Sequence, residues 1–523
     1  MVQQKLVSRF APVISFIRKN FSQILCYAII VVVVIATFLL QDRIVGFEPG
    51  YDDLQPKHHG WVTAQTLAII SKATAENGFV GYALAVKDDQ NKPDYLYFDR
   101  YPVFFSALFN KVLSLRSNMS GQIYLAKQVM NLIFLCTLVM AFLIIDKLIG
   151  NKPLALTIVL LAFSNPFLLF YKDMVHFDQP ALFGFLLLIY ALALYKLDGL
   201  KIPLYISTFV AIGLGRGYAS IAILILWLVF EAFLILKARG LAIGEKIKKI
   251  LRHPSFFLLV IGIAWAASLL SYNVLVEAHK RNVPVLQTSI LMSAENRLSM
   301  NQAFNQENID IINWSDFIIG QVDRIVKWTF PINQVNLGFL GNSILLGIMF
   351  LVMGIIIRRQ TLEKRIIYLI LVLSGFAWIF PLRNLAAFHD YTTMYYIGIS
   401  LVFYLSIFSF LKPSRETAYY LAIMGLVIYV SALGQVRDLH NQRAGNADQY
   451  TYDFMQIVDK IDGKGKNVYL ADTIPYGPYP AGFYLSGEYL SPLNVADYVV
   501  SRDKTYLPDN LTPDNRLVFL FKK

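Results

Sequence analysis

The sequence is poor in cysteine and in charge. Its 523 residues include two cysteines, Cys26 and Cys136, and both lie inside apolar runs. Two such thiols form neither a disulfide framework nor the spaced ligand set of a structural metal site, so both classes are excluded. Charged residues make up 16% of the chain, whereas soluble domains carry about 25%. The chain also has no internal repeat and no low-complexity tract.

Apolar residues are abundant instead. Hydrophobic residues make up 56% of the chain, and the mean hydropathy is +0.51. Over such a length these values indicate a polytopic membrane protein rather than a large soluble core. The formal net charge of +12 comes from Lys and Arg that cluster beside apolar runs, and no basic stripe interleaved with aromatic residues occurs elsewhere. We therefore expect basic cytoplasmic loops and no nucleic-acid partner.

Eleven apolar runs approach the roughly 20 residues that a membrane-spanning helix needs. The first run has no small-residue cleavage site, so we expect a retained helix and not a signal peptide. The run at 202–215 is short and could form a tight hairpin with its successor. The sequence predicts a polytopic α-helical membrane protein with about eleven transmembrane helices, at 24–40, 123–147, 153–171, 179–196, 202–215, 218–237, 256–277, 337–357, 365–381, 392–411 and 418–434.

Lys and Arg predict the orientation of these helices, because cytoplasmic loops carry an excess of both. Four basic clusters fall on one side by the count of spans, and this side is predicted to be the cytoplasm. The longer pieces 41–122, 278–336 and 438–523 then lie outside, together with the C-terminus. The clusters are Lys5, Arg9, Arg18 and Lys19; the Lys and Arg residues of 237–252; Arg358, Arg359, Lys364 and Arg365; and Lys412 with Arg415.

The external pieces are predicted to be structured. In the loop 41–122, WVTAQTLAIISKA and PVFFSALFNKVLSL repeat apolar residues at helical spacing. We expect both helices to lie flat at the membrane interface, with Tyr95, Tyr97 and Tyr101 at headgroup level. The tail contains a helical pattern, the apolar strand NVYLAD and a loop rich in Pro and Gly. Residues 438–523 are therefore predicted to form a small extracytoplasmic α/β domain beside a transmembrane domain at 1–437.

The densest polar cluster, EPGYDDLQPKHHGW, directly follows the first apolar run. A carboxylate at such a boundary is partly desolvated, which raises its basicity and suits it to take a proton from an attacking hydroxyl. Asp52 and Asp53 are therefore candidate catalytic bases, and the sequence does not choose between them. Glu48, His58 and His59 share the cluster. The alternative is an ordinary solvated loop.

A second polar stretch, KDMVHFDQPALFGF, follows the third predicted span on the external side. Lys172, His176 and Asp178 meet there at the start of the next helix. Asp178 followed by Gln179 and Pro180 is typical of a helix N-cap. A helix N-terminus at the membrane surface also suits an anionic headgroup, so the structural and the functional interpretation do not conflict.

Basic side chains follow at two more external turns. In GLGRGYAS, Arg216 lies between glycines, and an Arg at membrane depth faces a cavity or an anion unless it reaches out to the interface. We favour phosphate contact, because the flanking glycines let backbone and guanidinium approach closely. PLRNLAAFHDYTTMYY gathers Arg383, His389 and Tyr391. His389 could donate to phosphate, although a lone loop histidine is more often a plain surface residue.

These motifs together resemble the GT-C superfamily of membrane glycosyltransferases, specifically the branch of protein O-mannosyltransferases and the lipid A aminoarabinose transferase. That family has an acidic motif in a long first external loop followed by interfacial helices, and here YDD precedes HHGWVTAQTLAIISKATAENGF and YFDRYPVFFSALFNKVL. FDQPALFGF matches a D-x-P-x-x-F-F phrase, GLGRGYAS a small-residue turn with a basic residue, and FHDYTTMYY a His-and-Tyr motif. The resemblance covers nearly the whole chain. One departure is that LQPKHHG separates the acids from the following helix.

The resemblance implies a reaction and a role for each motif. A sugar linked to undecaprenyl or dolichyl phosphate would move, with inversion, to an extracytoplasmic hydroxyl. The implied catalytic residues are Asp52, Asp53 and Asp178. Those implied to bind the donor phosphate are Arg216, Lys172, Arg383 and His389, and those implied to bind the acceptor or orient the reacting groups are His58, His59, Glu48 and Tyr391. No cofactor is assigned, although the two adjacent histidines could hold a divalent metal.

A transporter or flippase of a lipid-linked or anionic solute is the alternative function. Transporters usually have inverted repeats and broken helices at mid-membrane, whereas the polar residues here lie at external helix ends. A polymerase of lipid-linked oligosaccharides or a membrane sensor explains the motifs less well. The expected partners are a polyprenyl-phosphate sugar donor, membrane lipid, and a glycan, lipid or protein acceptor. The lean composition and short loops favour a bacterial inner membrane.

Overall fold

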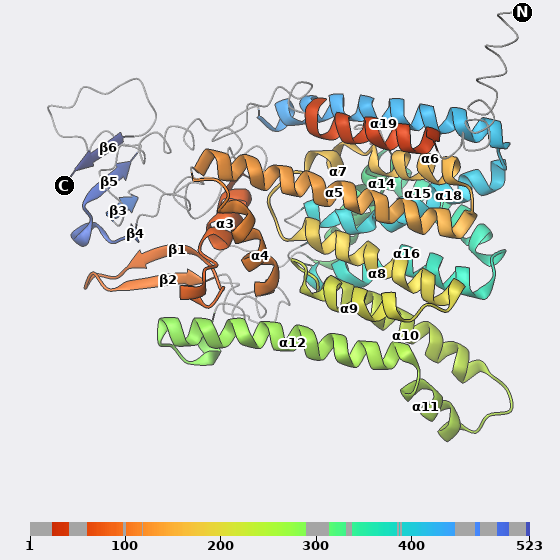
Figure 1. Ribbon diagram of the computed structural model, residues 1–523, viewed down its shortest axis with the longest axis horizontal. Coiled ribbons are helices and arrows are strands. Elements are labelled where there is room, and N and C mark those ends of the chain that lie inside the picture. Colours follow the sequence, from red (N-terminus) through yellow and green to blue (C-terminus); the bar gives the residue numbers. More distant parts are fainter. Residues whose placement is uncertain are drawn as a thin grey trace, which may run out of the picture.

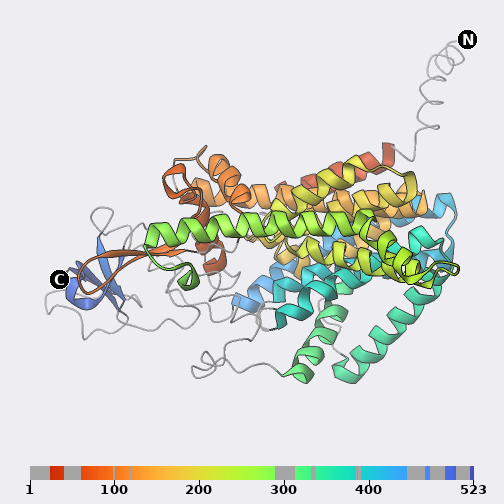
Figure 2. The same cartoon turned by 90° about the horizontal axis from the view of Figure 1, so that it is seen from below.

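The computed structural model shows a bundle of apolar helices with a smaller region of helices and strands at one end (Figures 1 and 2). The residues that the structure describes are 24–40, 60–97, 101–117, 119–288, 313–330, 337–383, 386, 390–444, 466–470, 489–501 and 519–522.

Eight helices in the described part of the chain are long and apolar enough to cross a membrane. The predicted fold class, a polytopic α-helical membrane protein, is confirmed. The eight helices are α5 (Met119–Ile149), α8 (Asp178–Asp198), α10 (Ala219–Lys237), α12 (Pro254–Arg281), α15 (Gly338–Arg358), α16 (Leu362–Ile379) continued to Leu382, α18 (Ile397–Leu411) extended back to Tyr391 by η8 (Asp390–Tyr396), and α19 (Arg415–Ala444).

Three of the eleven predicted spans are shorter helices, at Ile24–Phe38, α6 (Lys152–Phe163) and α9 (Ile202–Gly213). The last two have 12 residues each and rise about 18 Å, less than the roughly 30 Å of a hydrocarbon core. The predicted span 153–171 is interrupted after α6, because the side chain of Asn165 caps the separate helix α7 (Pro166–Phe170). Its Oδ1 accepts hydrogen bonds from the next turn, so the backbone restarts there.

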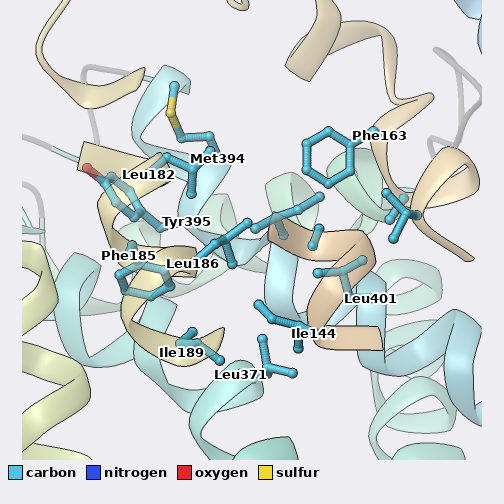
Figure 3. Close-up of a cluster of buried hydrophobic side chains, with 14 of the residues drawn as sticks. Ile144, Phe163, Leu182, Phe185, Leu186, Ile189, Leu371, Met394, Tyr395 and Leu401 are labelled. Atoms are coloured by element: carbon cyan, nitrogen blue, oxygen red, sulfur yellow. The ribbon is translucent and has the colours of Figure 1, made fainter. Parts of the chain in front are cut away.

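The core lies where α5, α6, α8, α16 and α18 meet (Figure 3). α8 is buried on nearly all sides from Asp178 to Ala193, and the half-buried Phe183, Leu187 and Tyr190 follow one narrow line along it. A helix that is apolar all round is expected in the middle of such a bundle. The labelled side chains of this core are Ile144, Phe163, Leu182, Phe185, Leu186, Ile189, Leu371, Met394, Tyr395 and Leu401.

Small residues allow two close helix contacts in this core. A Cβ atom added to Gly398 would lie 2.0 Å from the carbonyl oxygen of Leu371, so α16 and α18 touch through their backbones. A Cβ at Gly184 would lie 2.9 Å from the Cα of Ala211, which brings α8 equally close to α9. Backbone contact of this kind is what holds helices together in lipid, where burial of apolar surface gives little driving force.

The region at one end of the bundle contains the two predicted helices of the first loop (Figure 1). They are confirmed as α3 (Gly60–Ser71) and α4 (Val103–Leu113). α3 is almost wholly buried against α4 and its surroundings. α4 leaves Phe104 and Leu108 57% and 53% exposed, as expected of a helix that presents an apolar face to the interface.

A six-stranded sheet in this region joins the first loop to the tail. The strand order is β2-β1-β4-β3-β5-β6, with parallel pairing between β1, β4, β3 and β5 and antiparallel pairing at both edges. The predicted strand NVYLAD is confirmed as β3. The strands are β1 (Tyr82–Lys87), β2 (Pro93–Tyr97), β3 (Asn467–Leu470), β4 (Tyr489–Leu490), β5 (Tyr498–Ser501) and β6 (Phe519–Lys522).

The hairpin β1–β2 corrects the interpretation of its tyrosines. Tyr95 and Tyr97 lie on a strand of the sheet, and Tyr97 and Tyr101 are 2% and 7% exposed. The prediction that they sit at headgroup level was therefore wrong for these two buried rings. β1 of the first loop pairs directly with β4 of the tail. The sheet therefore contains strands from both sides of the predicted domain boundary at 437/438, and the tail does not form it by itself.

The basic segment 237–252 lies at the opposite end of the bundle from the sheet (Figure 1). It contains α11 (Ile243–Leu251), a short helix with no buried residue and with Lys248 and Lys249 in its last turn. The sheet, built from strands of the first loop and the tail, and this basic loop are thus at opposite ends, as the predicted topology requires. Which end faces the cytoplasm stays a prediction.

Candidate functional site

The segment between α7 and α8 places a carboxylate inside the protein. All residues from Leu168 to Leu182 are buried, and the side chain of Asp178 is 0% exposed. Asp178 is the first residue of α8, but the N-cap position belongs to Phe177 and no side chain caps this helix. The predicted N-cap role of Asp178 was therefore wrong, and its carboxylate is directed to other partners.

The turn between α9 and α10 brings Arg216 to this carboxylate. Gly215 has a φ of +53°, and a Cβ atom there would lie 2.2 Å from the carbonyl oxygen of Phe177. A Cβ at Gly217 would lie 2.2 Å from the carbonyl oxygen of Ala211. Both positions therefore need glycine. The backbone N–H of Arg216 then donates to the carbonyl oxygen of Phe177 over 3.1 Å, which fixes the turn beside the start of α8.

Three side chains from different segments contact the Asp178 carboxylate. Arg216 Nη1 lies 3.1 Å from Asp178 Oδ2, and His176 Nδ1 lies 2.6 Å from the same oxygen. The hydroxyl of Tyr395 donates to Oδ1 over 3.2 Å. Tyr395 belongs to η8 (Asp390–Tyr396), so its ring connects the core of Figure 3 to this cluster. A buried carboxylate held by so many partners is a rigid feature of the fold.

The first external loop contacts the other side of Arg216. Arg216 Nη2 donates to the hydroxyl of Tyr101 over 2.9 Å and lies 3.4 Å from His176 Nε2. The ring of Tyr101 stacks on Phe177 at a centroid distance of 3.7 Å. The backbone oxygen of Tyr101 accepts a hydrogen bond of 2.7 Å from the side chain of Asn273 on α12. The cluster thus joins the first loop, α8, α12 and η8, and from here on it is called the Asp178 cluster (Tyr101, His176, Asp178, Arg216 and Tyr395).

The guanidinium of Arg216 keeps its charge in this setting. Its side chain is 2% exposed. Burial by itself lowers the pKa of Arg216, but the adjacent Asp178 carboxylate outweighs burial, and the pKa lies well above its usual value. Within the described residues, Arg216 Nε has no hydrogen-bond acceptor, and Nη1 has only the ion pair with the Asp178 carboxylate. Buried donors are almost always satisfied, so these atoms are suited to an anion that enters the site.

Two further predicted residues lie in or beside the cluster. Lys172 is fully buried in the same segment, and its Nζ donates to Asn131 Oδ1 on α5. Tyr391 is buried with its ring 5.1 Å from the ring of His176. Arg383 lies elsewhere, with its guanidinium 4.8 Å above the ring of Trp314 on α14 (Trp314–Thr329).

The remaining predicted site residues are not among those that the structure describes. Their positions relative to the Asp178 cluster stay predictions. They are Glu48, Asp52, Asp53, His58, His59 and His389. In the described ranges, no group of three or more His, Cys, Asp or Glu side chains could hold a metal ion.

The sequence analysis missed the contact of Asn273 with the Asp178 cluster and misinterpreted Tyr101. Asn273 was not singled out, although an Asn inside the apolar run of α12 is itself a signal, because polar groups in a span need a partner. Tyr101 was interpreted as an interfacial aromatic, whereas it hydrogen-bonds Arg216 from inside the protein.

No protein-family model matches the sequence, and no curated protein matches it. Among solved structures, the chain is similar to ArnT from Cupriavidus metallidurans bound to undecaprenyl phosphate, with 11% identity and a TM-score of 0.56. The match covers 93% of this chain and 94% of that chain. The archaeal oligosaccharyltransferase AglB from Archaeoglobus fulgidus, in complex with an inhibitory peptide and a dolichol-phosphate, matches with 11% identity and a TM-score of 0.49, over 94% of this chain and 70% of that chain.

The likeness to ArnT extends over both chains almost from end to end and shows a shared fold. The fold expected from the motifs, that of a polytopic membrane protein like ArnT, is thereby confirmed. The polytopic membrane architecture follows from the same match and from the eight long apolar helices.

Proposed function

We propose that this protein is a glycosyltransferase that moves a sugar from a polyprenyl-phosphate donor to an extracytoplasmic acceptor. The observation that carries the proposal is the buried, charged Arg216, whose Nε lacks an acceptor in the described part of the chain and whose Nη1 has only the ion pair with Asp178. It occurs in a chain with the fold of ArnT, which was solved with undecaprenyl phosphate bound. A phosphate that ends a polyprenyl chain matches such a donor group in charge and in geometry.

Arg216 binds the donor phosphate in this proposal. As the bond between the sugar and the phosphate breaks, negative charge grows on the bridging oxygen. A fixed guanidinium in a water-poor site stabilises that charge without having to reorganise. The neighbouring Lys172 adds positive charge from the same segment. Arg383 and His389 remain further candidates for phosphate contact.

Sugar transfer follows as one in-line displacement. The oxygen of the acceptor hydroxyl forms a bond to the anomeric carbon while the bond from that carbon to the phosphate oxygen breaks, which inverts the anomeric centre. The phosphate takes the bonding electron pair and leaves as polyprenyl phosphate, a stable anion that needs no proton. Asp52 or Asp53 accepts the proton of the hydroxyl. Glu48, His58, His59 and Tyr391 then bind the acceptor or orient the reacting groups.

Asp178 has a different part from the other two acids. Its two oxygens already contact Arg216, His176 and Tyr395, and the charge of Arg216 opposes its protonation. We therefore assign Asp178 to holding the guanidinium and the imidazole in place, and proton abstraction to the first-loop carboxylates. The site faces the outside of a bacterial inner membrane, on the side of the C-terminus.

Transfer by the full-length protein in lipid nanodiscs tests the proposal. A panel of labelled undecaprenyl- and dolichyl-phosphate sugars serves as donor, and a cell-envelope extract supplies acceptors. Arg216→Gln is expected to lower transfer by about 10² to 10³-fold. Arg359→Gln, the same change at an exposed position on the C-cap of α15, is expected to have no effect.

Two results would contradict the proposal. One is equal transfer by the Arg216→Gln variant and its control. The other is the absence of transfer from every donor in the panel while sealed vesicles take up the same lipid-linked or anionic solute, which would favour the transporter or flippase.

A further inference from the structure

The end of the bundle remote from Asp178 contains a cavity of about 650 Å³. Four helices form it, through the last turn of α5, the first turn of α6, the second half of α8 and the first residue of α19. Its volume falls within the range of about 300 to 1,000 Å³ that ligand pockets occupy. The lining residues are Leu143, Asp146, Lys147, Gly150, Asn151, Lys152, Pro153, Tyr190 and Arg415.

An ion pair places this cavity far from the candidate site. Lys147 Nζ lies 2.6 Å from Asp198 Oδ2, so the end of α5 is beside the end of α8. Asp178 and Asp198 are the first and last residues of the 21-residue helix α8. At 1.5 Å per residue they are about 30 Å apart, which is the thickness of a hydrocarbon core. The cavity is therefore at the opposite membrane surface from the Asp178 cluster.

The charges of the lining favour an anion. Lys147, Lys152 and Arg415 oppose one carboxylate, Asp146. Asp198 engages Lys147 from outside the lining, and Asp146 interacts with Lys152. The three cations still outnumber these two carboxylates, and Arg415 and the exposed Lys152 are the cations that a ligand can meet. Arg415 Nε is within 2.9 Å of the Tyr419 hydroxyl, a neutral partner that does not cancel its charge. The side chains of Lys152 and Arg415 are both exposed, so an incoming group can reach them.

The remaining lining is apolar or open. Leu143, Pro153 and the ring of Tyr190 give the cavity an apolar wall. At Gly150, with a φ of +66°, an added Cβ would meet no heavy atom within 4 Å, so the space beside this turn is open. A cavity with two available cations and an apolar wall, at the end of membrane spans, matches a molecule that has a charged head and an apolar body.

We propose that this cavity binds the phosphate headgroup of an anionic phospholipid in the leaflet opposite the candidate site. Lys152 and Arg415 contact the phosphate, and the wall of Leu143, Pro153 and Tyr190 borders the glycerol and the start of the acyl chains. Basic pockets between membrane helices on the cytoplasmic side are suited to such headgroups. The site is independent of the sugar-transfer proposal, because it shares no residue with the Asp178 cluster.

Native mass spectrometry of the full-length protein tests this assignment. The protein is released from nanodiscs that contain phosphatidylglycerol and phosphatidylcholine in equal amounts, and the lipids that stay bound are counted. The unchanged protein is expected to retain phosphatidylglycerol preferentially. The double variant Lys152→Glu/Arg415→Glu is expected to lose about tenfold of that preference. The control Lys201→Glu/Arg239→Glu carries the same charge change on exposed residues of the same end, outside the cavity, and is expected to retain it.

Three outcomes would overturn the proposal. Equal loss in both double variants would assign the preference to general surface charge. An unchanged preference in the cavity variant would remove the site. Complete displacement of bound phosphatidylglycerol by glycerol 3-phosphate or inorganic phosphate would assign the cavity to a soluble phosphate compound. A milder pair, Lys152→Gln/Arg415→Gln, replaces the cavity variant if the charge reversal prevents folding, and the same three outcomes then apply.

Discussion

Two ion clusters lie at opposite ends of α8, and only the first belongs to the proposed site. At the start of α8, Asp178 contacts Arg216, His176 and Tyr395. At its end, Lys196 forms an ion pair with Glu231 of α10. Glu231 also accepts a 3.0 Å hydrogen bond from Trp227 and lies 3.7 Å from His253 Nε2.

The kinds of partner do not separate these two clusters, although the second is less deeply buried, with the side chains of Lys196 and Glu231 14% and 10% exposed. Both hold a carboxylate against a cation, a histidine and an aromatic donor. They differ in unused hydrogen-bond donors. Arg216 Nε is buried without an acceptor in the described chain, whereas none of the buried atoms of Lys196, Trp227 or Glu231 lacks a partner. A satisfied cluster ties helices together. A cluster with spare buried donors is prepared for a further ligand.

The largest expected effect comes from removing the central charge of each cluster. Asp178→Asn leaves the Arg216 charge buried without its counter-ion, and we expect the free energy of unfolding to fall by about 3–5 kcal/mol. Transfer per folded molecule should fall by about 10²-fold or more, because the guanidinium loses its orientation. The matched change Glu231→Gln should cost about 1–3 kcal/mol and leave transfer per folded molecule unchanged.

Unfolding in a titration with denaturing detergent, combined with the transfer assay on the folded fraction, measures both quantities. Loss of transfer in the Glu231 variant, at full folding, would erase the distinction between the clusters.

A second comparison uses two fully buried tyrosines. The hydroxyl of Tyr395 donates to the charged Asp178, whereas that of Tyr429 shares a 2.9 Å hydrogen bond with the neutral hydroxyl of Thr37. Tyr395→Phe should therefore lower the unfolding free energy by about 1.5–3 kcal/mol and Tyr429→Phe by about 0.5–1.5 kcal/mol. Only the Tyr395 variant should also slow transfer. Equal effects of the two changes on both readouts would argue against a special role for the Asp178 cluster.

A smaller effect is expected at the helix that supports the cluster from outside. Asn273→Ala removes the hydrogen bond to the carbonyl oxygen of Tyr101, so Tyr101 holds Arg216 less firmly. We expect kcat to fall about five- to tenfold, equivalent to roughly 1 kcal/mol of barrier. Asn342→Ala, which removes a 2.9 Å bond from another buried Asn to Asp323, is the control and should leave kcat unchanged. Steady-state kinetics separates kcat from KM, and an unaltered kcat in the Asn273 variant would contradict the positioning role.

The smallest effect is expected at the exposed pair of Lys147 and Asp198, whose side chains are 31% and 33% accessible. Exposed ion pairs contribute about 0–1 kcal/mol, and salt screens them. Asp198→Asn should therefore change the unfolding free energy by less than about 1 kcal/mol and should not alter transfer. The same detergent titration at low and high salt checks this. A loss as large as that of Asp178→Asn would show that burial does not decide the difference.

The sequence predicted the positions of the helices in this protein more accurately than their lengths. Apolar runs identified every long helix, because each span must be apolar over its whole length. Hydropathy could not show that Asn165 restarts the backbone as a separate helix after α6, since one capping side chain hardly changes an average over twenty residues. The early end of α9 was indicated in the sequence, because the glycine-rich GLGRG turn begins there.

Local motifs also identified the pair of Asp178 and Arg216, although not what surrounds it. The turn at Arg216 needs glycine on both sides, and this local requirement is visible in the sequence itself. The contacts of Tyr101 and the strand pairing of β1 depend on residues hundreds of positions away, such as Asn273 and Tyr489. Periodicity within a segment contains no information on such partners, so the strands β1 and β2 were missed and Tyr97 and Tyr101 were given the wrong environment.

The pairing of β1 with β4 sets an order of events during synthesis. Ala85 of the first loop lies opposite Tyr489 near the end of the chain, and roughly 400 residues separate them. At a ribosomal speed of about 5–20 residues per second, the first loop waits on the order of 20 to 80 seconds for its neighbouring strand. The sheet is therefore completed only after the last helix has entered the bilayer. A nascent chain interrupted between these two steps has a complete membrane bundle and an incomplete sheet.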